Sequence, residues 1–396
     1  MPELEGRRLW FAGIGGAGMS ALAVVTRAWG AEVSGWDRSD TPYLAALDGV
    51  PIEISPSPPA PPDGWEPIVS TAFVDRVAGR SRGDLLAELV GSRRSIVVAG
   101  AHGKTTTAAM IAFCLDRLGL DPTFLIGGDV PQLGGNARAG EGWVVAEGDE
   151  SDRSLELLTP EVGVLTNIDL DHHTSFASLS EVEAFFLGWL EGCSACVRGD
   201  LLEPVATDLA VPGEHNRRNA AAALAALEIA GVERRAAESA IGEFRGVGRR
   251  LEVRGEAGGV RVLDDYGHHP AEITATVAAV REAHPGARVL VLFQPHLFSR
   301  TRHLAEELAE ALARADGVWL TEVYGAREEP LGGVTGKLVV DALARRRPGM
   351  GIGWAPALDD GARGIAAWAR PGDVVLTVGA GNVDSVGSVI LDRLGG

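Results

Sequence analysis

The spacing of apolar and polar positions predicts strands that alternate with helices along the whole chain. In the first region a strand runs into a glycine-rich turn that opens a helix, and Gly30 ends that helix. The elements expected there are a strand at 8–11, a helix at 19–29 and strands at 32–36 and 68–73. Seven prolines between Pro51 and Pro67 exclude a helix from that segment and predict a long surface loop. This order of elements is typical of a Rossmann-like unit.

Two further regions repeat the alternation. In the second region we expect strands at 96–100, 142–146 and 162–166, and helices at about 104–118 and at 219–230. In the third region we expect strands at 260–263, 288–293, 317–320 and 373–378, separated by helices. A new strand-loop-helix unit begins after Arg94, and the glycine- and arginine-rich segment 244–250 is typical of a hinge. The sequence therefore predicts an α/β protein with three domains, at 1–94, 95–247 and 248–396.

The composition is that of a water-soluble globular protein. Of its 396 residues, 46% are hydrophobic and 23% are charged, and the formal net charge is -18. A negative surface repels phosphate backbones, so nucleic acid and anionic membranes are disfavoured as partners. No apolar run approaches the roughly 18 residues that span a bilayer, and the first residues lack the apolar core of a signal peptide. We therefore expect a cytoplasmic protein.

Cysteine and lysine are both scarce, which limits where their chemistry can occur. The three cysteines are too few for a disulfide framework, and the lone pair Cys193 and Cys196 fits incidental residues better than a metal or redox site. The only lysines are Lys104 and Lys337, so chemistry that requires a lysine has two possible positions.

The first glycine motif has the spacing GxGxxG at Gly13, Gly15 and Gly18, and Asp37 follows 19 residues after its last glycine. Glycines let a phosphate approach backbone N–H groups at a helix N-terminus, where the helix dipole favours negative charge. The motif fits a dinucleotide such as NAD, a nucleotide diphosphate, or a turn required only for packing. This segment does not choose between them.

The second glycine motif is more specific. It comprises Gly100, Gly103, Lys104, Thr105 and Thr106, between an apolar strand and a helix. Backbone amides there can cradle a polyphosphate, the lysine can neutralise its oxygens, and a threonine hydroxyl can bind Mg²⁺. The spacing GxxGKT is two residues shorter than the ordinary Walker A loop. The structural alternative is a tight turn with an exposed lysine.

Acidic residues follow two of the predicted strands of the middle region. Glu147 comes directly after the first of these strands, where a carboxylate can bind Mg²⁺. The acids Asp149, Glu150 and Asp152 fit a solvated face equally well. After the strand at 162–166 comes the segment 167–173, which contains two aspartates and two histidines and can complete a metal site.

Other polar clusters lie at strand ends or helix starts further along the chain. The amides of Asn216 and Asn219 are three positions apart, so they share a helix face and can read an adenine edge, with helix capping as the alternative. Arg250 and Arg300 can clamp a phosphate or carboxylate with their planar forks, with surface ion pairing as the alternative.

Taken together, these motifs resemble the Mur ligases of peptidoglycan synthesis. The matching segments occur in the family's order over nearly the whole chain, and the combination is specific although no single piece is. They are GIGGAGM at 13–19, GAHGKTTT at 100–107, AEGDESD at 146–152, TNIDLDH at 166–172, GEHNRRNAAAA at 213–223, GVGRR at 246–250, DDYGHHP at 264–270, FQPHLFSRTR at 293–302 and GDVVLTVGAGN at 372–382.

The resemblance implies a division of labour among three domains. It implies a Rossmann-like N-terminal domain for UDP-N-acetylmuramate, a P-loop-type central domain for ATP, and a Rossmann-like C-terminal domain for the amino acid. The segments DDYGHHP and FQPHLFSRTR resemble the alanine-adding branch. The implied reaction joins L-alanine to the lactyl carboxylate of the sugar through an acyl phosphate, with ATP and Mg²⁺. In this family the first glycine loop faces the UDP diphosphate and not NAD.

The resemblance also implies roles for individual residues. The catalytic set is Lys104, Glu147, His172, Arg250, His268 and Arg300. The ATP contacts are Gly100, Gly103, Lys104, Thr105, Thr106, Asn216, Asn219, Arg250 and Asp265, and the metal ligands are Thr105, Glu147 and His172. The UDP-sugar contacts are Gly15, Gly16, Asp37, Ser70 and Arg82, and the amino-acid contacts are His268 and Arg300.

The chain departs from the family pattern in two places that bear on function. Leu297 stands where many relatives carry arginine, which puts one contact to the amino-acid carboxylate in doubt. The stretch 177–212 is short for the family, which predicts a central domain without peripheral strands.

Three alternatives to an alanine-adding ligase remain open from the sequence. The first is the murein-tripeptide-recycling ligase, a close relative with different residues in the C-terminal motifs. The second is an NAD-dependent oxidoreductase built on the first glycine motif, and the third is a nucleotide-binding scaffold without turnover.

Overall fold

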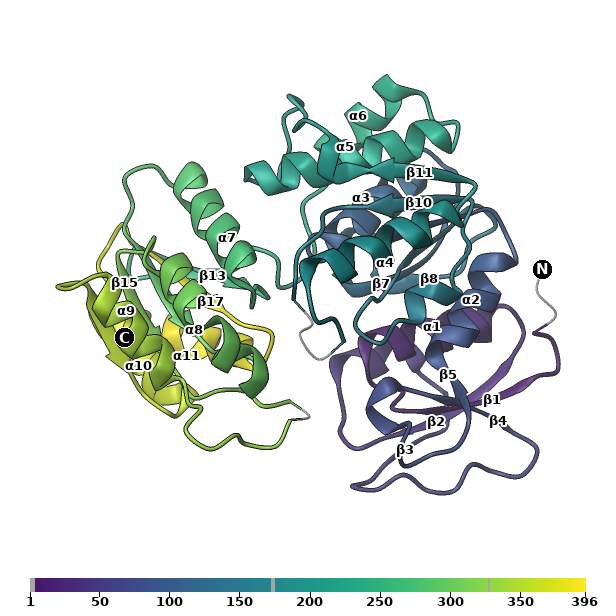
Figure 1. The fold of residues 1–396 in the computed structure, drawn as a ribbon, viewed down its shortest axis with the longest axis horizontal. Coiled ribbons are helices and arrows are strands. Elements are labelled where there is room, and N and C mark those ends of the chain that lie inside the picture. Colours follow the sequence, from purple (N-terminus) through teal and green to yellow (C-terminus); the bar gives the residue numbers. More distant parts are fainter. Residues whose placement is uncertain (1–3, 172–174, 327) are drawn as a thin grey trace. The chain divides into compact units, whose positions relative to one another are not determined.

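The computed structural model describes residues 4–171, 175–326 and 328–396, and it contains three separate sheets with helices packed against them (Figure 1). Each sheet is mostly parallel. The predicted fold class, α/β with mostly parallel sheets, is confirmed.

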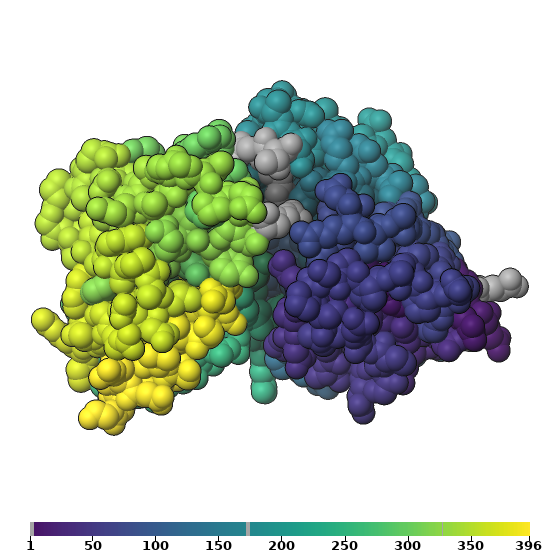
Figure 2. Space-filling view, turned by 90° about the horizontal axis from the view of Figure 1, so that it is seen from below, coloured from purple at the N-terminus to yellow at the C-terminus, as the bar shows by residue number. Residues whose placement is uncertain are grey.

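The chain divides into two compact units, one made of residues 1–210 and 216–247 and the other of residues 211–215 and 248–396. The first unit contains two of the sheets and the second contains the third. Figure 2 shows one face of the molecule, with most of the first unit in purple to teal and the second unit in green to yellow.

The first sheet has the strand order β3-β2-β1-β4-β5, and all its strands are parallel. Its strands are β1 (Arg8–Ala12), β2 (Glu32–Asp37), β3 (Ile52–Ile54), β4 (Glu66–Val69) and β5 (Arg80–Ser81). Its helices are α1 (Ala17–Ala28), α2 (Arg82–Gly91) and the short 3-10 helices η1 (Pro42–Leu47) and η2 (Thr71–Phe73). Phe11, Ile14 and Leu22 are buried in one core, which packs α1 on the sheet.

Two sequence expectations about this sheet are wrong in detail. The strand expected at 68–73 ends at Val69, because the Ser70 side chain accepts a hydrogen bond from the backbone of Ala72 and starts η2. The loop expected at 51–67 contains the edge strand β3, whose three residues precede most of the prolines.

The second sheet has the order β11-β10-β6-β9-β7-β8 and is parallel except for the pair β7 and β8. Its strands are β6 (Ser95–Ala99), β7 (Thr123–Val130), β8 (Gly135–Arg138), β9 (Val144–Glu147), β10 (Val162–Leu165) and β11 (Ala195–Arg198). The associated helices are α3 (Lys104–Arg117), α4 (Leu179–Glu191), α5 (Glu214–Ile229), α6 (Arg234–Gly242) and the 3-10 helices η3 (Pro131–Leu133), η4 (Ser154–Leu157) and η5 (Gly199–Leu201). Every residue of β6 is buried, as the unbroken apolar run predicted.

The helix expected at 219–230 begins five residues earlier, at Glu214, so the polar motif that precedes the alanine run is itself helical. With 16 residues, α5 is the longest helix in the described part of the chain. None of the described helices combines the length and the apolar character needed to cross a bilayer.

The third sheet, in the second unit, has the order β12-β13-β17-β14-β15-β16, and only β12 and β13 pair antiparallel. Its strands are β12 (Glu252–Ala257), β13 (Val260–Asp265), β14 (Val289–Phe293), β15 (Gly317–Leu320), β16 (Gly351–Trp354) and β17 (Val374–Val378). Its helices are α7 (Pro270–Ala283), α8 (Phe298–Leu312), α9 (Lys337–Arg346), α10 (Leu358–Trp368), α11 (Gly387–Gly395) and the 3-10 helix η6 (Val383–Val386). Two buried clusters, one including Phe293 and the other Leu292, pack helices on both faces.

Each sheet of the first unit has a topological switch point. In the first sheet the chain leaves β1 toward β2 on one side and returns to β4 on the other. In the second sheet it leaves β6 toward β7, and it leaves the neighbouring β10 toward β11 on the opposite side. Ligands of open α/β sheets bind at the carboxyl ends of strands where the connections diverge in this way.

Candidate active site

The loop between β6 and α3 requires glycine at positions 100 and 103. Gly100 and Gly103 have φ values of 128° and 79°, which side chains rarely adopt. A Cβ on Gly100 would collide with the Thr166 hydroxyl, and one on Gly103 would collide with Oδ1 of Asn219. The backbone of this loop is therefore fixed by contacts with β10 and α5.

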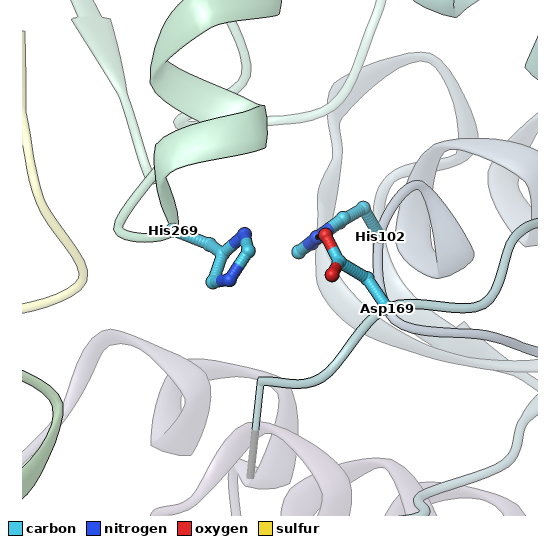
Figure 3. Close-up of side chains that lie close together, drawn as sticks. All are labelled: His102, Asp169 and His269. Carbon is cyan, nitrogen blue, oxygen red and sulfur yellow. Dashed lines mark hydrogen bonds and ion pairs between the residues drawn. The ribbon is translucent and has the colours of Figure 1, made fainter. Parts of the chain in front are cut away.

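Hydrogen bonds from the neighbouring strand end hold the same loop. The amide of Ala101 donates to the Asn167 carbonyl at 3.2 Å, and that of His102 donates to Asn167 Oδ1 at 2.9 Å. Asn167 Nδ2 donates back to the His102 carbonyl at 2.8 Å. The His102 ring lies 3.2 Å from an Asp169 oxygen, as Figure 3 shows. The same figure includes His269, a residue of the second unit. Asn167 thus shapes the loop without belonging to it.

Lys104 is the first residue of α3, and its ammonium is engaged by oxygen atoms. Its Nζ lies 3.0 Å from both carboxylate oxygens of Glu150, which is only 3% exposed, and 2.5 Å from the Gly100 carbonyl. Burial would lower the pKa of Lys104, but the carboxylates of Glu150 and Asp149 outweigh it and raise that pKa. The ammonium therefore stays charged and is surrounded by acceptors that a phosphate can replace.

Thr105 and Glu147 form a second polar pair beside this lysine. The Thr105 hydroxyl donates to Glu147 Oε2 at 3.0 Å, and the amide of Gly127 donates to Glu147 Oε1 at 2.5 Å. Glu147 is the last residue of β9, the neighbour of β6. A hydroxyl and a carboxylate next to a phosphate loop are the oxygen ligands that Mg²⁺ accepts. Thr106, one residue on, is buried.

Asn216 and Asn219 lie one turn apart on α5, as the spacing predicted. Asn219 Nδ2 donates to Asn216 Oδ1 at 3.4 Å, and both side chains are buried. Because Asn219 Oδ1 lies against Gly103, the pair belongs to the same cluster as the glycine loop.

The first glycine loop is organised by an acid. Asp37, at the end of β2, is 7% exposed and accepts a hydrogen bond from the amide of Gly15 at 2.8 Å. Gly16 is exposed, and Ser70 follows β4, which flanks β1 on the side opposite to β2. The structure thus brings together these candidates for the UDP-sugar site.

Arg82, the fifth candidate for that site, starts α2 and pairs with the acid run of the second sheet. Its Nη2 forms ion pairs with Asp149 and, at 3.1 Å, with Asp152. Its Nη1 lies 3.1 Å from the position that a Cβ on Gly18 would take. The arginine therefore connects the first glycine loop to the segment that follows Glu147.

The remaining candidates lie in the second unit. Arg250 Nη1 donates to Glu272 Oε1 at 3.3 Å, and its guanidinium lies over the Tyr266 ring. The oxygens of Asp265 accept hydrogen bonds from the amides of Leu251 and Gly267, both at 2.9 Å. Burial raises the pKa of the Asp265 carboxyl. Arg250 and Asp265 thus help to hold the loop that follows β13.

His268 and Arg300 are joined through a third side chain, His296. Arg300 Nη1 lies 3.0 Å from His296 Nδ1, and the ring of His296 lies 5.7 Å from that of His268. Tyr324 stacks on the other side of His296. Arg300 is 4% exposed, whereas His268 and His296 are half-buried and Tyr324 is exposed, so a buried guanidinium lies beneath a partly exposed aromatic group.

Two sequence expectations have specific outcomes here. His172, the third expected metal ligand, lies outside the described residues, so the metal set is seen only through Thr105 and Glu147. Leu297 precedes α8 with φ 68° and ψ 133°, and its backbone amide and carbonyl bond to Tyr324 and Thr301. Leu297 therefore has a left-handed backbone conformation that is unfavourable for a residue other than glycine. It is the position at which the family resemblance leads one to expect arginine.

Sequence reasoning missed Glu150, Asn167 and His296 as members of these clusters. Glu150 lay in an acidic run that also fits a solvated face, and its burial comes from the pairing with Lys104. Asn167 and His296 were inside quoted motifs, and their position directly after a strand was the available signal.

Comparisons with known proteins agree with this geometry. Residues 98–196 match the family model of the Mur ligase middle domain, and residues 249–381 match that of the Mur ligase glutamate ligase domain. The chain is 37% identical to the UDP-N-acetylmuramate–L-alanine ligase of Streptomyces griseus, with 97% of this chain and 96% of the relative covered. This chain belongs to the Mur ligase family. It is therefore an amide-forming ligase, and its middle segment has the family's ATP-binding fold.

Solved structures give the same fold for this Mur ligase. The alanine ligase MurC of Thermotoga maritima superposes with a TM-score of 0.79 at 27% identity, covering 98% of each chain. A murein peptide ligase of Psychrobacter arcticus superposes with a TM-score of 0.69 at 23% identity, covering 98% of this chain and 99% of that one. The alignment with the Streptomyces griseus relative spans 453 positions against a chain of 396 residues, so the relative contains segments that this chain lacks.

Proposed function

We propose that this Mur ligase joins L-alanine to the lactyl carboxylate of UDP-N-acetylmuramate in peptidoglycan precursor synthesis, at the expense of ATP. The observation that carries the proposal is the cluster of Lys104, Thr105 and Glu147 at the diverging strand ends of the second sheet. The similarity to alanine-adding ligases over nearly the whole chain supports the choice of substrates.

The residues of the cluster fit a nucleotide triphosphate with Mg²⁺. The Thr105 hydroxyl and the Glu147 carboxylate are 3.0 Å apart and supply two oxygen ligands for the cation, and His172 is the proposed third ligand. When bound, the cation would neutralise charge on the phosphate oxygens. Lys104 would exchange Glu150 for those oxygens, with Gly100 and Gly103 keeping the backbone open beside them.

The same proposal assigns the other nucleotide contacts. Asn216 and Asn219 would bind the adenine, because their buried amides lie on α5 against Gly103. From the second unit, Arg250 would contribute to the phosphates and Asp265 to the ribose.

The two acceptor substrates have separate proposed sites. The UDP-sugar would lie on the first glycine loop, with contacts from Gly15, Gly16, Asp37, Ser70 and Arg82. L-alanine would be held by His268 and Arg300, whose cluster offers a buried guanidinium to a carboxylate. The proposed domains follow the three sheets, at 1–94, 95–247 and 248–396.

The proposed chemistry has two steps. The lactyl carboxylate attacks the γ-phosphorus of ATP, which gives an acyl phosphate and releases ADP. The amine of L-alanine then attacks the acyl carbon, and inorganic phosphate leaves as the amide forms. The protein's contribution is positioning and charge neutralisation, with shielding of the acyl phosphate from water.

A three-substrate assay tests the proposal. Purified protein should release inorganic phosphate only when Mg²⁺-ATP, UDP-N-acetylmuramate and L-alanine are all present. Release with the murein tripeptide in place of L-alanine would instead identify a recycling ligase. ATP binding without release under any of these conditions would identify a scaffold, and NADH binding would favour an oxidoreductase.

A further inference from the structure

The guanidinium of Arg82 is held along the edge formed by Nε and Nη2. Its Nε donates to Thr71 Oγ1 and Asp152 Oδ2, both at 3.3 Å, and its Nη2 pairs with Asp149 and Asp152. Within residues 4–171, 175–326 and 328–396, Nη1 donates no hydrogen bond. That nitrogen is the one beside Gly18, the last glycine of the first loop.

All four carboxylate oxygens of the two aspartates accept hydrogen bonds from within the protein. Asp149 Oδ1 accepts from the amide and hydroxyl of Ser151, at 2.9 and 2.6 Å, while Oδ2 takes Arg82. Asp152 Oδ1 accepts from the amide of Ser154 at 3.0 Å, and Oδ2 takes the Thr71 hydroxyl at 2.7 Å as well as Arg82. The acceptors of both aspartates therefore help to fix the loop or the arginine.

We propose that Asp149 and Asp152 are positioning residues that orient Arg82 so that its Nη1 edge meets the diphosphate of the UDP-sugar at the first glycine loop. The inference rests on the proposed function, since it takes that diphosphate as the ligand. It gives the acid run that begins at the end of β9 two tasks, because Glu147 and Glu150 serve the ATP site whereas Asp149 and Asp152 serve the UDP site. One short segment of the second sheet thereby contributes to both nucleotide sites of the first unit.

An arginine held by carboxylates loses little entropy when it binds an anion, because its fork is already in place. Replacing Asp149 by asparagine removes the charge that holds Nη2, and the side chain becomes free to leave the loop. A charged hydrogen bond of this kind corresponds to about 10- to 100-fold in affinity. The lost affinity should come from the contacts with the phosphates alone, and the affinity for the uridine part of the ligand should not change.

The test is calorimetric titration of the full-length protein with UDP and with uridine. We expect Asp149→Asn and Asp152→Asn to weaken UDP binding about 10- to 100-fold and to leave uridine binding unchanged. Glu161→Gln is the matched control, since Glu161 is an acid of the same unit that pairs with Arg94 at the surface. It should bind both ligands like the unmodified protein.

A double-mutant cycle separates orientation from general structure. With Arg82→Ala as background, Asp149→Asn should cause no further loss of UDP affinity, because the residue acts only through the arginine. Additive losses, equal losses for UDP and uridine, or unchanged UDP binding in both aspartate variants would each overturn the inference. If Asp149→Asn fails to fold, Asp152→Asn carries the same cycle.

The outcome is distinguishable from failure of the proposed function. Unmodified protein that releases phosphate in the three-substrate assay while its aspartate variants bind UDP normally overturns the inference alone. Unmodified protein that binds neither UDP nor UDP-N-acetylmuramate overturns both.

Discussion

The two glycine loops of the first unit differ in the source of their positive charge. The loop after β6 carries its own cation, because Lys104 follows its last glycine directly. The loop after β1 has no basic residue between Gly13 and Gly18, and the guanidinium of Arg82 reaches it from α2. Both loops thus contain glycines, but only the second loop carries a basic residue of its own.

The loops also differ in what holds their backbone. Reciprocal hydrogen bonds with Asn167 and contacts with Asn219 fix the second loop. In the first loop the Asp37 carboxylate accepts the Gly15 amide, and the Thr41 hydroxyl donates to the Gly15 carbonyl at 2.7 Å. The carbonyl of Trp36, in β2, accepts the amides of Gly13 and Ile14. The difference teaches that glycine spacing specifies a backbone that a phosphate can approach, while neighbouring strands decide the charge and the ligand.

The largest expected effect is that of removing the cation from the second loop. Lys104→Ala should lower phosphate release by roughly 10²–10³-fold or more, because no other ammonium is available to the phosphates. The measurement is the three-substrate assay, with thermal unfolding as the check on folding. Lys337→Ala, which removes the chain's other lysine at the exposed start of α9, should retain normal activity.

Truncation of Lys104 also leaves the buried carboxylate of Glu150 without its ammonium, which destabilises the fold. The double variant Lys104→Ala with Glu150→Gln removes that charge and should recover stability without recovering turnover. A near-normal rate in either variant would show that the second loop does not depend on its own cation.

The positions of both loops could be predicted from the sequence, because each lies where an apolar strand meets a helix. The residues that pair with Lys104 and Arg82 could not be predicted in this way. Lys104 meets Glu150 across 46 positions of sequence, and Arg82 meets Asp149 across 67. Only the strand order brings these residues together, and periodicity does not reveal strand order.

Local chemistry explains the errors in the elements. The run Ile68–Phe73 has a strand's composition, but the Ser70 hydroxyl captures a backbone amide and turns the chain into η2. The antiparallel pair β7 and β8 was not anticipated, because its glycine-rich sequence has little alternation of apolar and polar positions.

A smaller effect is expected from adding a methyl group to the second loop. Gly103→Ala meets Asn219 and has to adopt φ 79°, so we expect a loss of about 1–3 kcal/mol in the free energy of unfolding and weaker ATP binding. Gly119→Ala is the matched control, because Gly119 follows the same helix with φ 72° and open space around it. Chemical denaturation and ATP titration measure both variants.

Gly119→Ala should show only the cost of the left-handed backbone, about 1 kcal/mol, with ATP binding unchanged. The difference between the two variants isolates the contact with Asn219. Equal stability losses together with equal ATP affinities would mean that α5 does not constrain the loop.

The smallest effect is expected at the first loop, where Asp37 accepts the Gly15 amide and other hydrogen bonds also hold the backbone. Asp37→Asn keeps an acceptor for Gly15 but removes its charge, which should cost about 1 kcal/mol in the free energy of unfolding and weaken UDP binding several-fold. Asp40→Asn, at an exposed aspartate after the same strand, is the control and should change neither quantity. ATP affinity should be the same in both variants, because the second loop takes its backbone support from Asn167 and its charge from Lys104. If ATP affinity fell along with UDP affinity in Asp37→Asn alone, the two loops would share their support, and the contrast between them would have to be given up.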